Sequence, residues 1–152
     1  MISKINGADI VINYQYLKDL NFENPKAPSV YSVQSFRPDT RVSFDINATR
    51  LQETVFEVEI VINVVANSDK RVGKEINMFN LDITYAGVFT IKDVPDSLVQ
   101  ENLFIDCPTL IFPFMRRIIA DTVRDANFPP LMVDMIDFEK IYDEKKEGLR
   151  NV

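Results

Sequence analysis

Residues 55–65 read VFEVEIVINVV, and this stretch decides the class of fold. Apolar residues recur at every second position from Phe56 to Val64, and Glu57 and Glu59 lie between them. A period of two, rich in β-branched residues, predicts a β-strand with one face turned towards a core. The opposite face is also partly apolar, because it carries valines at positions 55, 61 and 65.

Three further stretches alternate in the same way, at residues 10–16, 41–47 and 76–91. Four strands in sequence predict one antiparallel sheet. Gly87 inside the last strand predicts a bulge or a close approach of the backbone. The first eight residues have no such pattern, and we expect them to be loose.

Residues 21–39 contain three prolines, which exclude a regular helix and disfavour a central strand. The segment is nevertheless apolar and aromatic, with Phe22, Val30, Tyr31, Val33 and Phe36. We therefore expect a long crossover loop that lies against the domain.

The pattern becomes helical after Pro95, which opens a short helix through about residue 104. A longer helix follows, with apolar residues spaced by three and four up to Val123; Pro113 either starts it or kinks it. Asn127 suits the left-handed position that ends a helix. The last helix is expected to begin after Asp137 as N-cap and to end at Gly148.

These elements predict an α+β fold: a four-stranded antiparallel sheet with a long crossover loop, packed with C-terminal helices. The 152 residues fit a single domain, residues 1–152, with a core from about 9 to 147. Neither a repeat nor a second domain is visible.

The composition argues against catalysis. The chain has no histidine, one cysteine and four scattered glycines, so the common acid–base pairs, zinc sites and phosphate loops are missing. Cys107 is either a nucleophile or a small buried hydrophobe, and the lack of a histidine partner favours the second. We expect no enzyme activity, no catalytic residue, no metal and no cofactor.

The charge and the cysteine count indicate a compartment and exclude some partners. The net charge of −6 disfavours nucleic acid and anionic lipid as partners. One cysteine permits no internal disulfide, and the N-terminus lacks the apolar region of a signal peptide. With no apolar run near 20 residues, the chain is expected to be cytoplasmic without direct membrane insertion.

The apolar surplus of residues 55–65 and of the crossover has two explanations. It forms an interface between subunits, or it forms a groove for an extended apolar peptide. The two are compatible.

Four stretches carry a resemblance to a known family: YLKDLNFENPKAP at 16–28, CPTLIFPF at 107–114, NFPPL at 127–131 and IDF at 136–138. In combination they resemble the SecB protein-export chaperones. The resemblance covers roughly residues 10–145, with the elements in the expected order.

The resemblance implies a homotetramer, a dimer of dimers, in which each protomer has an antiparallel sheet and two helices. It implies an ATP-independent chaperone that binds unfolded secretory precursors in hydrophobic grooves, keeps them translocation-competent and delivers them to the ATPase SecA.

The resemblance also suggests site residues, carried over position by position. The SecA-binding positions are Asp19, Glu23, Asn80 and Asp82, and Asn80 stands where an apolar residue is expected. Candidates for client binding are Tyr31, Phe36, Val42, Phe44 and Tyr142, for which an ordinary place in the core is the alternative. Leu81, Ile83 and Tyr85 match a strand that the family uses for assembly and client contact.

Two other functions compete with a general export chaperone. One is a SecB-like chaperone dedicated to a toxin–antitoxin partner, and Asp19 and Glu23 argue against it. The other is a small α+β enzyme of the hot-dog thioesterase type, in which the sheet wraps around a helix near the start of the chain. Here the strands precede the long helix, which disfavours that fold.

Overall fold

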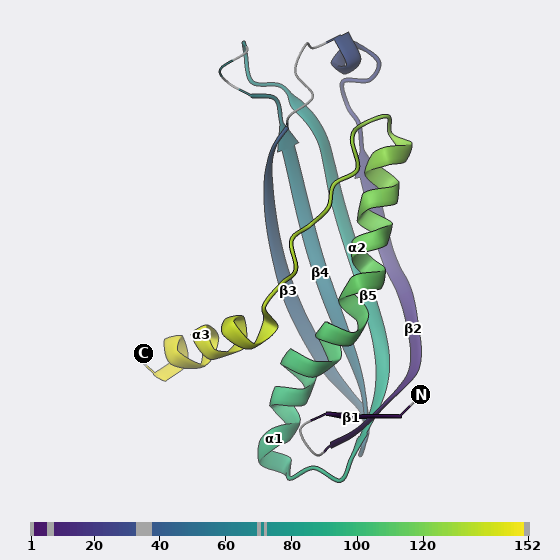
Figure 1. Ribbon diagram of the computed structural model, residues 1–152, viewed down its shortest axis with the longest axis vertical. Coiled ribbons are helices and arrows are strands. Elements are labelled where there is room, and N and C mark those ends of the chain that lie inside the picture. Colours follow the sequence, from purple (N-terminus) through teal and green to yellow (C-terminus); the bar gives the residue numbers. More distant parts are fainter. Residues whose placement is uncertain (1, 6–7, 33–37, 70, 72, 151–152) are drawn as a thin grey trace.

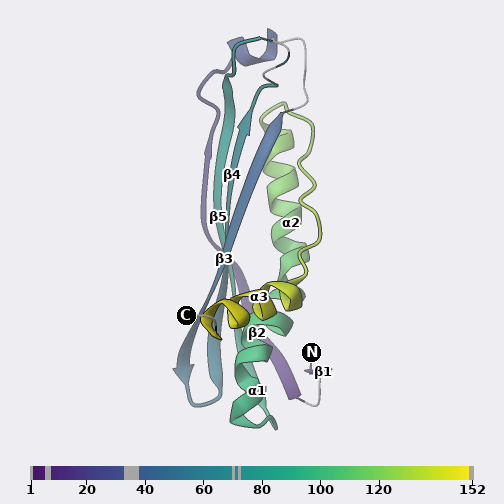
Figure 2. The same cartoon turned by 90° about the vertical axis from the view of Figure 1, so that its left-hand side faces the viewer.

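An antiparallel sheet forms one layer of the protein, and helices cover one of its faces (Figures 1 and 2). The computed structural model describes residues 2–5, 8–32, 38–69, 71 and 73–150. The strands are β1 (Ile2–Ile5), β2 (Ala8–Glu23), β3 (Asp39–Gln52), β4 (Val55–Asn67) and β5 (Asn77–Lys92). Their order across the sheet is β1-β2-β5-β4-β3.

The four predicted strands are confirmed as β2 to β5, and each is longer than or close to its predicted range. The expectation that the first eight residues are loose is wrong for residues 2–5. These pair antiparallel with the start of β2, from Ile2 opposite Val11 to Ile5 opposite Ala8. The sequence ISKI does not alternate, so only the pairing with β2 defines this strand.

The two faces of the sheet differ as the alternation predicts. In β4, every second residue from Phe56 to Ala66 is buried against the helices, on what we call the covered face. The other side, which carries Glu57, Glu59 and Val65, is the open face; Val65 is 40% exposed there. Gly87 lies on the covered face, where an added Cβ would come within 2.7 Å of the Phe89 ring, so the predicted close approach is confirmed.

The described part of the proline-rich crossover packs against the domain as predicted, but residues 21–23 continue β2 instead of forming a loop. After β2 the chain turns into a short 3₁₀ helix, η1 (Ser29–Ser32), whose Val30 is 2% exposed. Phe22 stacks on Phe79 at 5.6 Å between ring centroids. Phe36 lies outside the described residues.

The first helical stretch is nearly continuous. It consists of α1 (Asp96–Glu101), a π-helical segment (Asn102–Asp106) and α2 (Cys107–Asp125). Pro113 lies inside α2, which excludes the first of its two predicted roles, that of starting the main helix. An interior proline costs about 3 kcal/mol, but the buried side chains around it contribute about 1.5–3 kcal/mol each and outweigh that cost.

Asn127 ends the stretch as predicted, with φ of 66°. The N–H of Asn127 donates to the carbonyl of Arg124, and the N–H of Phe128 donates to that of Val123, the two bonds of a Schellman motif. None of the helices in the described part of the chain is both long and apolar enough to cross a membrane.

An extended linker, residues 129–137, leads to the last helix, α3 (Phe138–Arg150). Asp137 is its N-cap as predicted, because its carboxylate accepts the backbone N–H of Lys140 at 3.1 Å. The predicted end at Gly148 is wrong, since the helix continues to Arg150. A glycine within a helix costs only about 1 kcal/mol, so one glycine does not by itself end a helix.

Candidate functional site

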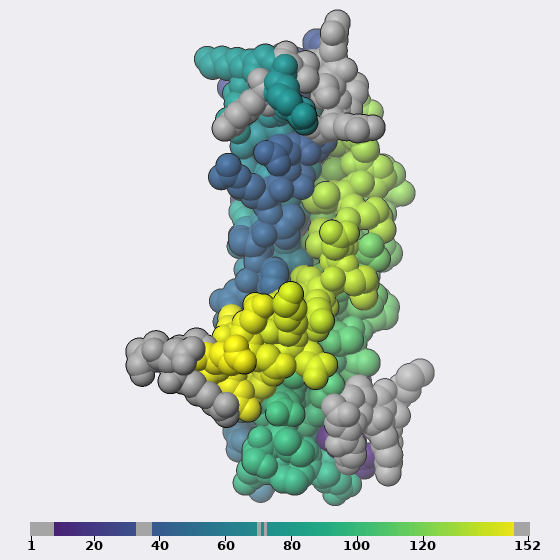
Figure 3. Space-filling view, turned by 60° about the vertical axis from the view of Figure 1, so that its left-hand side comes forward, coloured from purple at the N-terminus to yellow at the C-terminus, as the bar shows by residue number. Residues whose placement is uncertain are grey.

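A groove lies between the free edge strand β3 and the linker to α3, and its volume is about 480 Å³ (Figure 3). Three elements form it: the covered face of β3, the linker, and the first turns of α3. The lining residues are Thr40, Val42, Phe44, Leu131, Met132, Val133, Asp134, Met135, Ile136, Asp137, Lys140, Ile141 and Glu144.

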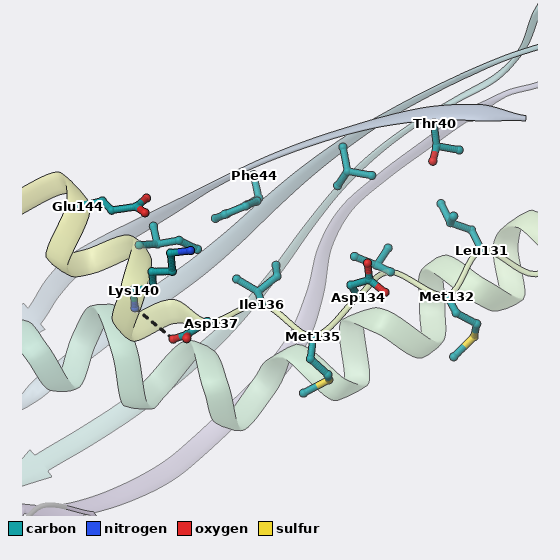
Figure 4. A pocket seen from close by; sticks show the side chains of 13 residues that line it. Thr40, Phe44, Leu131, Met132, Asp134, Met135, Ile136, Asp137, Lys140 and Glu144 are labelled. Atoms are coloured by element: carbon teal, nitrogen blue, oxygen red, sulfur yellow. Dashed lines mark hydrogen bonds between the residues drawn. The ribbon is translucent and has the colours of Figure 1, made fainter.

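The inside of the groove is apolar. Phe44 from β3 and Ile136 from the linker point towards each other across it (Figure 4). Val42 is 41% exposed although it lies on the covered face, because the helices leave this end of β3 open. Ile141 of α3 completes the apolar surface. When apolar side chains of a partner cover such a surface, the burial is favourable by about 25 cal/mol per Å² of apolar area.

The rim of the groove is acidic. Asp134, Asp137 and Glu144 lie along it, and Lys140 is its only cation among the described lining residues. A second, shallower hollow of about 390 Å³ continues along α3. It adds the carboxylates of Glu139, Asp143 and Glu147. The rim attracts cationic groups and leaves the apolar interior to uncharged side chains.

The predicted client-binding residues separate in the structure. Val42 and Phe44 line the groove together. Tyr142 does not, because its ring stacks on Phe104 at 6.2 Å between centroids. Tyr31 lies in η1, where its hydroxyl is hydrogen-bonded to Asn24 and to the backbone.

The prediction missed the linker residues and Ile141. The sequence LMVDMI at 131–136 is unusually apolar for a connection between two helices. This was the available signal, but by itself it does not distinguish a binding wall from an ordinary buried loop. The linker lies beside β3 only because α2 returns along the sheet, and a local pattern cannot reveal that (Figure 1).

The predicted SecA-binding residues lie together on the open face. Glu23 pairs with Asn80 across β2 and β5, and Asp82 lies one row further along. Asp82 accepts a hydrogen bond from the Asn63 side chain at 2.6 Å. Asp19 follows on the same face of β2, so the four residues form one polar surface opposite the groove side of the sheet.

A charged cluster continues this open face. The hydroxyl of Tyr16 donates to the Glu57 carboxylate, and the Lys18 ammonium binds both Glu57, at 3.0 Å, and Glu59. Burial and the bond to Glu57 raise the pKa of Tyr16 to about 12, and the same bond lowers the pKa of Glu57. Lys18 sits at a register shift of β2, which strict alternation could not predict.

The predicted assembly residues are buried inside the protomer. Leu81, Ile83 and Tyr85 are 0%, 1% and 6% exposed on the covered face. The exposed apolar residues nearby belong to β2 and α2: Leu17 and Leu20 lie opposite Tyr85 and Ile83, and Phe114 is 44% exposed.

Cys107 is fully buried, and burial raises the pKa of its thiol. This agrees with the prediction of a small buried hydrophobe rather than a nucleophile. Within the described residues, no three His, Cys, Asp or Glu side chains gather closely enough to hold a metal ion.

Comparisons with known proteins find relatives over most of the chain. The family model described as "Preprotein translocase subunit SecB" matches residues 4–148. A protein-export protein SecB of Zymomonas mobilis is 44% identical over 133 residues, which are 88% of this chain and 77% of that protein. One of Rickettsia bellii is 42% identical over 143 residues, 93% of this chain and 91% of that protein.

Among solved structures, the SecB-like chaperone of Mycobacterium tuberculosis superposes with a TM-score of 0.67. The match covers 84% of this chain and 90% of that one at 14% identity, and that protein was solved with a ChAD peptide from the HigA1 antitoxin. At this identity the likeness shows the fold, and it confirms the predicted arrangement of an antiparallel sheet packed with C-terminal helices.

Proposed function

Since the chain belongs to the SecB family of preprotein translocase subunits, which are export chaperones and not enzymes, we propose that it holds unfolded secretory precursors in the groove beside β3. It does so without ATP, keeps them translocation-competent and delivers them to SecA. The observation that carries the proposal is the apolar groove itself, with Val42 and Phe44 lining it on the face of the sheet that the helices cover.

The groove suits varied clients for a physical reason. Apolar burial is not directional, so many side chains of an unfolded chain satisfy it. Each contact contributes little, and the cost of ordering the client cancels part of the gain. The result is broad, moderate affinity, which a holding function requires and a catalytic site does not.

Assembly into a homotetramer, a dimer of dimers, is part of the proposal. Beyond its short pairing with β1, the outer edge of β2 pairs with no other strand among the described residues, and Tyr14 and Leu17 are 70% and 43% exposed on this strand. Together with Phe114 on α2, these residues offer apolar surface for a second copy. The proposed location is the cytoplasm, where precursors are made.

Delivery to SecA is assigned to the open face, with Asp19, Glu23, Asn80 and Asp82. This surface lies opposite the groove side of the sheet, so a client and SecA would not compete for the same residues. Its acidic character suits a basic partner.

A chaperone dedicated to one antitoxin is the alternative. The solved relative with an antitoxin peptide shares only 14% identity, whereas relatives at 34–44% are named protein-export proteins. A pull-down with the zinc-bearing C-terminal tail of SecA separates the two. Binding supports the export role, and the absence of binding favours the dedicated chaperone.

The direct test measures aggregation of a denatured precursor on dilution, with and without the protein and in the absence of ATP. Light scattering on the same samples gives the mass of the assembly. Suppressed aggregation by a tetramer is expected. Unchanged aggregation at a several-fold excess of the protein would contradict the proposal.

A further inference from the structure

The linker that forms one wall of the groove is anchored at both ends. At its start, Phe128 packs on Phe79 with 5.1 Å between ring centroids. At its end, Phe138 packs edge-on against Phe112 at 5.8 Å. Between these rings, in residues 129–137, Val133 is the one buried side chain, and no backbone hydrogen bond within the described residues ties residues 129–136 to a strand.

One side chain holds the middle of this wall. The Nε–H of Arg116 on α2 donates a hydrogen bond to the backbone carbonyl of Val133 at 2.6 Å. Its Nη1 lies 3.8 Å from the Sδ atom of Met135. Arg116 has no ion pair with a carboxylate in the described part of the chain, so its polar contacts are with the linker.

We propose that Arg116 is a positioning residue for client binding: it latches the linker to α2, so that the groove exists before a client arrives. This inference rests on the proposed function. A hydrogen bond from a charged donor is about twice as strong as a neutral one. A preformed wall also lowers the ordering cost that a client would otherwise meet.

The position of the donor allows a discriminating set of substitutions. Arg116→Gln keeps a neutral N–H donor at the place of Nε, because both side chains have a nitrogen four atoms beyond Cα. Arg116→Lys keeps the charge but has a methylene group at that place. Arg116→Met removes both the donor and the charge. Arg124→Met is the control, because Arg124 is an exposed arginine of the same helix that pairs with Asp121 instead of the linker.

Two measurements are made on each variant of the full-length protein. The methyl signals of ¹³C-labelled methionines report on the linker through Met132 and Met135, and on the core through Met78 and Met115, which are 1% and 0% exposed. Stopped-flow fluorescence gives the rate at which a dye-labelled, permanently unfolded precursor dissociates.

The latch predicts a graded result. Arg116→Lys and Arg116→Met shift or broaden the Met135 signal, leave the Met78 and Met115 signals in place, and release the client ~10-fold faster. The Met135 signal and the release rate of Arg116→Gln lie nearer to those of wild type, and those of Arg124→Met match wild type. Because the signals of the buried Met78 and Met115 are followed in the same spectra, a loss of fold is distinguished from a loosened wall.

The contrary results are equally defined. Release rates for the lysine and methionine variants equal to wild type would overturn the role in client binding, as would a glutamine variant no better than the lysine variant. If wild-type protein binds no unfolded client at all, the proposed function fails and this role with it. The Met135 signal then still reports whether the latch itself exists.

Discussion

The hydroxyl of Tyr31 donates a hydrogen bond to the backbone carbonyl of Ala126, with 2.7 Å between the two oxygens. The same hydroxyl accepts a bond from the Asn24 amide at 2.8 Å, and the ring packs against Phe128. Tyr31 therefore ties the crossover to the end of α2, two segments that are distant in the sequence. Its position favours the core alternative over direct client contact.

Tyr31→Phe is predicted to lower the free energy of unfolding by about 1–3 kcal/mol, because two partly buried polar partners lose their bond. Urea denaturation measures the change. Ser43→Ala is the control, since Ser43 is exposed on the open face of β3, and its effect should stay within about 0.5 kcal/mol. A stable Tyr31→Phe variant that releases clients faster would instead assign the residue to client binding.

Val42→Ser is predicted to weaken client binding by ~3–10-fold, because it removes apolar area from the groove. Val65→Ser is a matched control: the two valines are 41% and 40% exposed on neighbouring strands, but Val65 lies on the open face. Titration of a labelled precursor measures both. Equal losses for the two variants would mean that the groove is not the client site.

Removing charge from the open face should weaken SecA binding and spare client binding. The double variant Glu23→Gln, Asp82→Asn is expected to lose affinity for SecA by ~10-fold at low salt, with a smaller loss at high salt because salt screens exposed charges. The double variant Asp134→Asn, Glu144→Gln changes the net charge equally on the groove rim. Calorimetry should find the SecA affinity of this groove-rim variant unchanged. If the groove-rim variant loses SecA affinity and the open-face variant does not, SecA does not bind the open face.

The pKa of Tyr16 predicts a loss of stability at alkaline pH. A folded-state pKa of about 12 exceeds the ordinary value of 10, so the folded state binds the phenolic proton more tightly than the unfolded state does. This stabilisation is complete below pH 10 and is lost as pH rises from 10 through 12. Denaturation at several pH values should show that the free energy of unfolding falls less between pH 10 and 12 for Tyr16→Phe than for wild type. Parallel curves of this free energy against pH for variant and wild type would contradict the raised pKa.

Much of the fold was predictable because its signals are local. The alternation of residues 55–65 defines β4, the left-handed Asn127 ends α2, and the Asp137 cap begins α3. The misses have a common cause: they depend on long-range contacts. Residues 2–5 become a strand by pairing with β2, and α2 continues through Pro113 because other residues of the helix, among them Ile111 and Phe112, are buried in the core.

The site was predictable only in part. The family resemblance suggested Val42 and Phe44, but the other wall comes from a linker without a pattern of its own. The Arg116 bond to Val133 joins residues 17 positions apart whose types suggest no partnership. The location of such a wall follows from the packing of α2 on the sheet.

Site-specific photocrosslinking to a bound precursor tests the central claim most directly. One variant carries a benzophenone side chain at Lys140, which is exposed and lines the groove, and the other carries it at Ser43, which is exposed on the open face of β3. The account predicts crosslinks to the precursor from position 140 and few from position 43. Equal crosslinking from both positions, or crosslinking from position 43 alone, would contradict it.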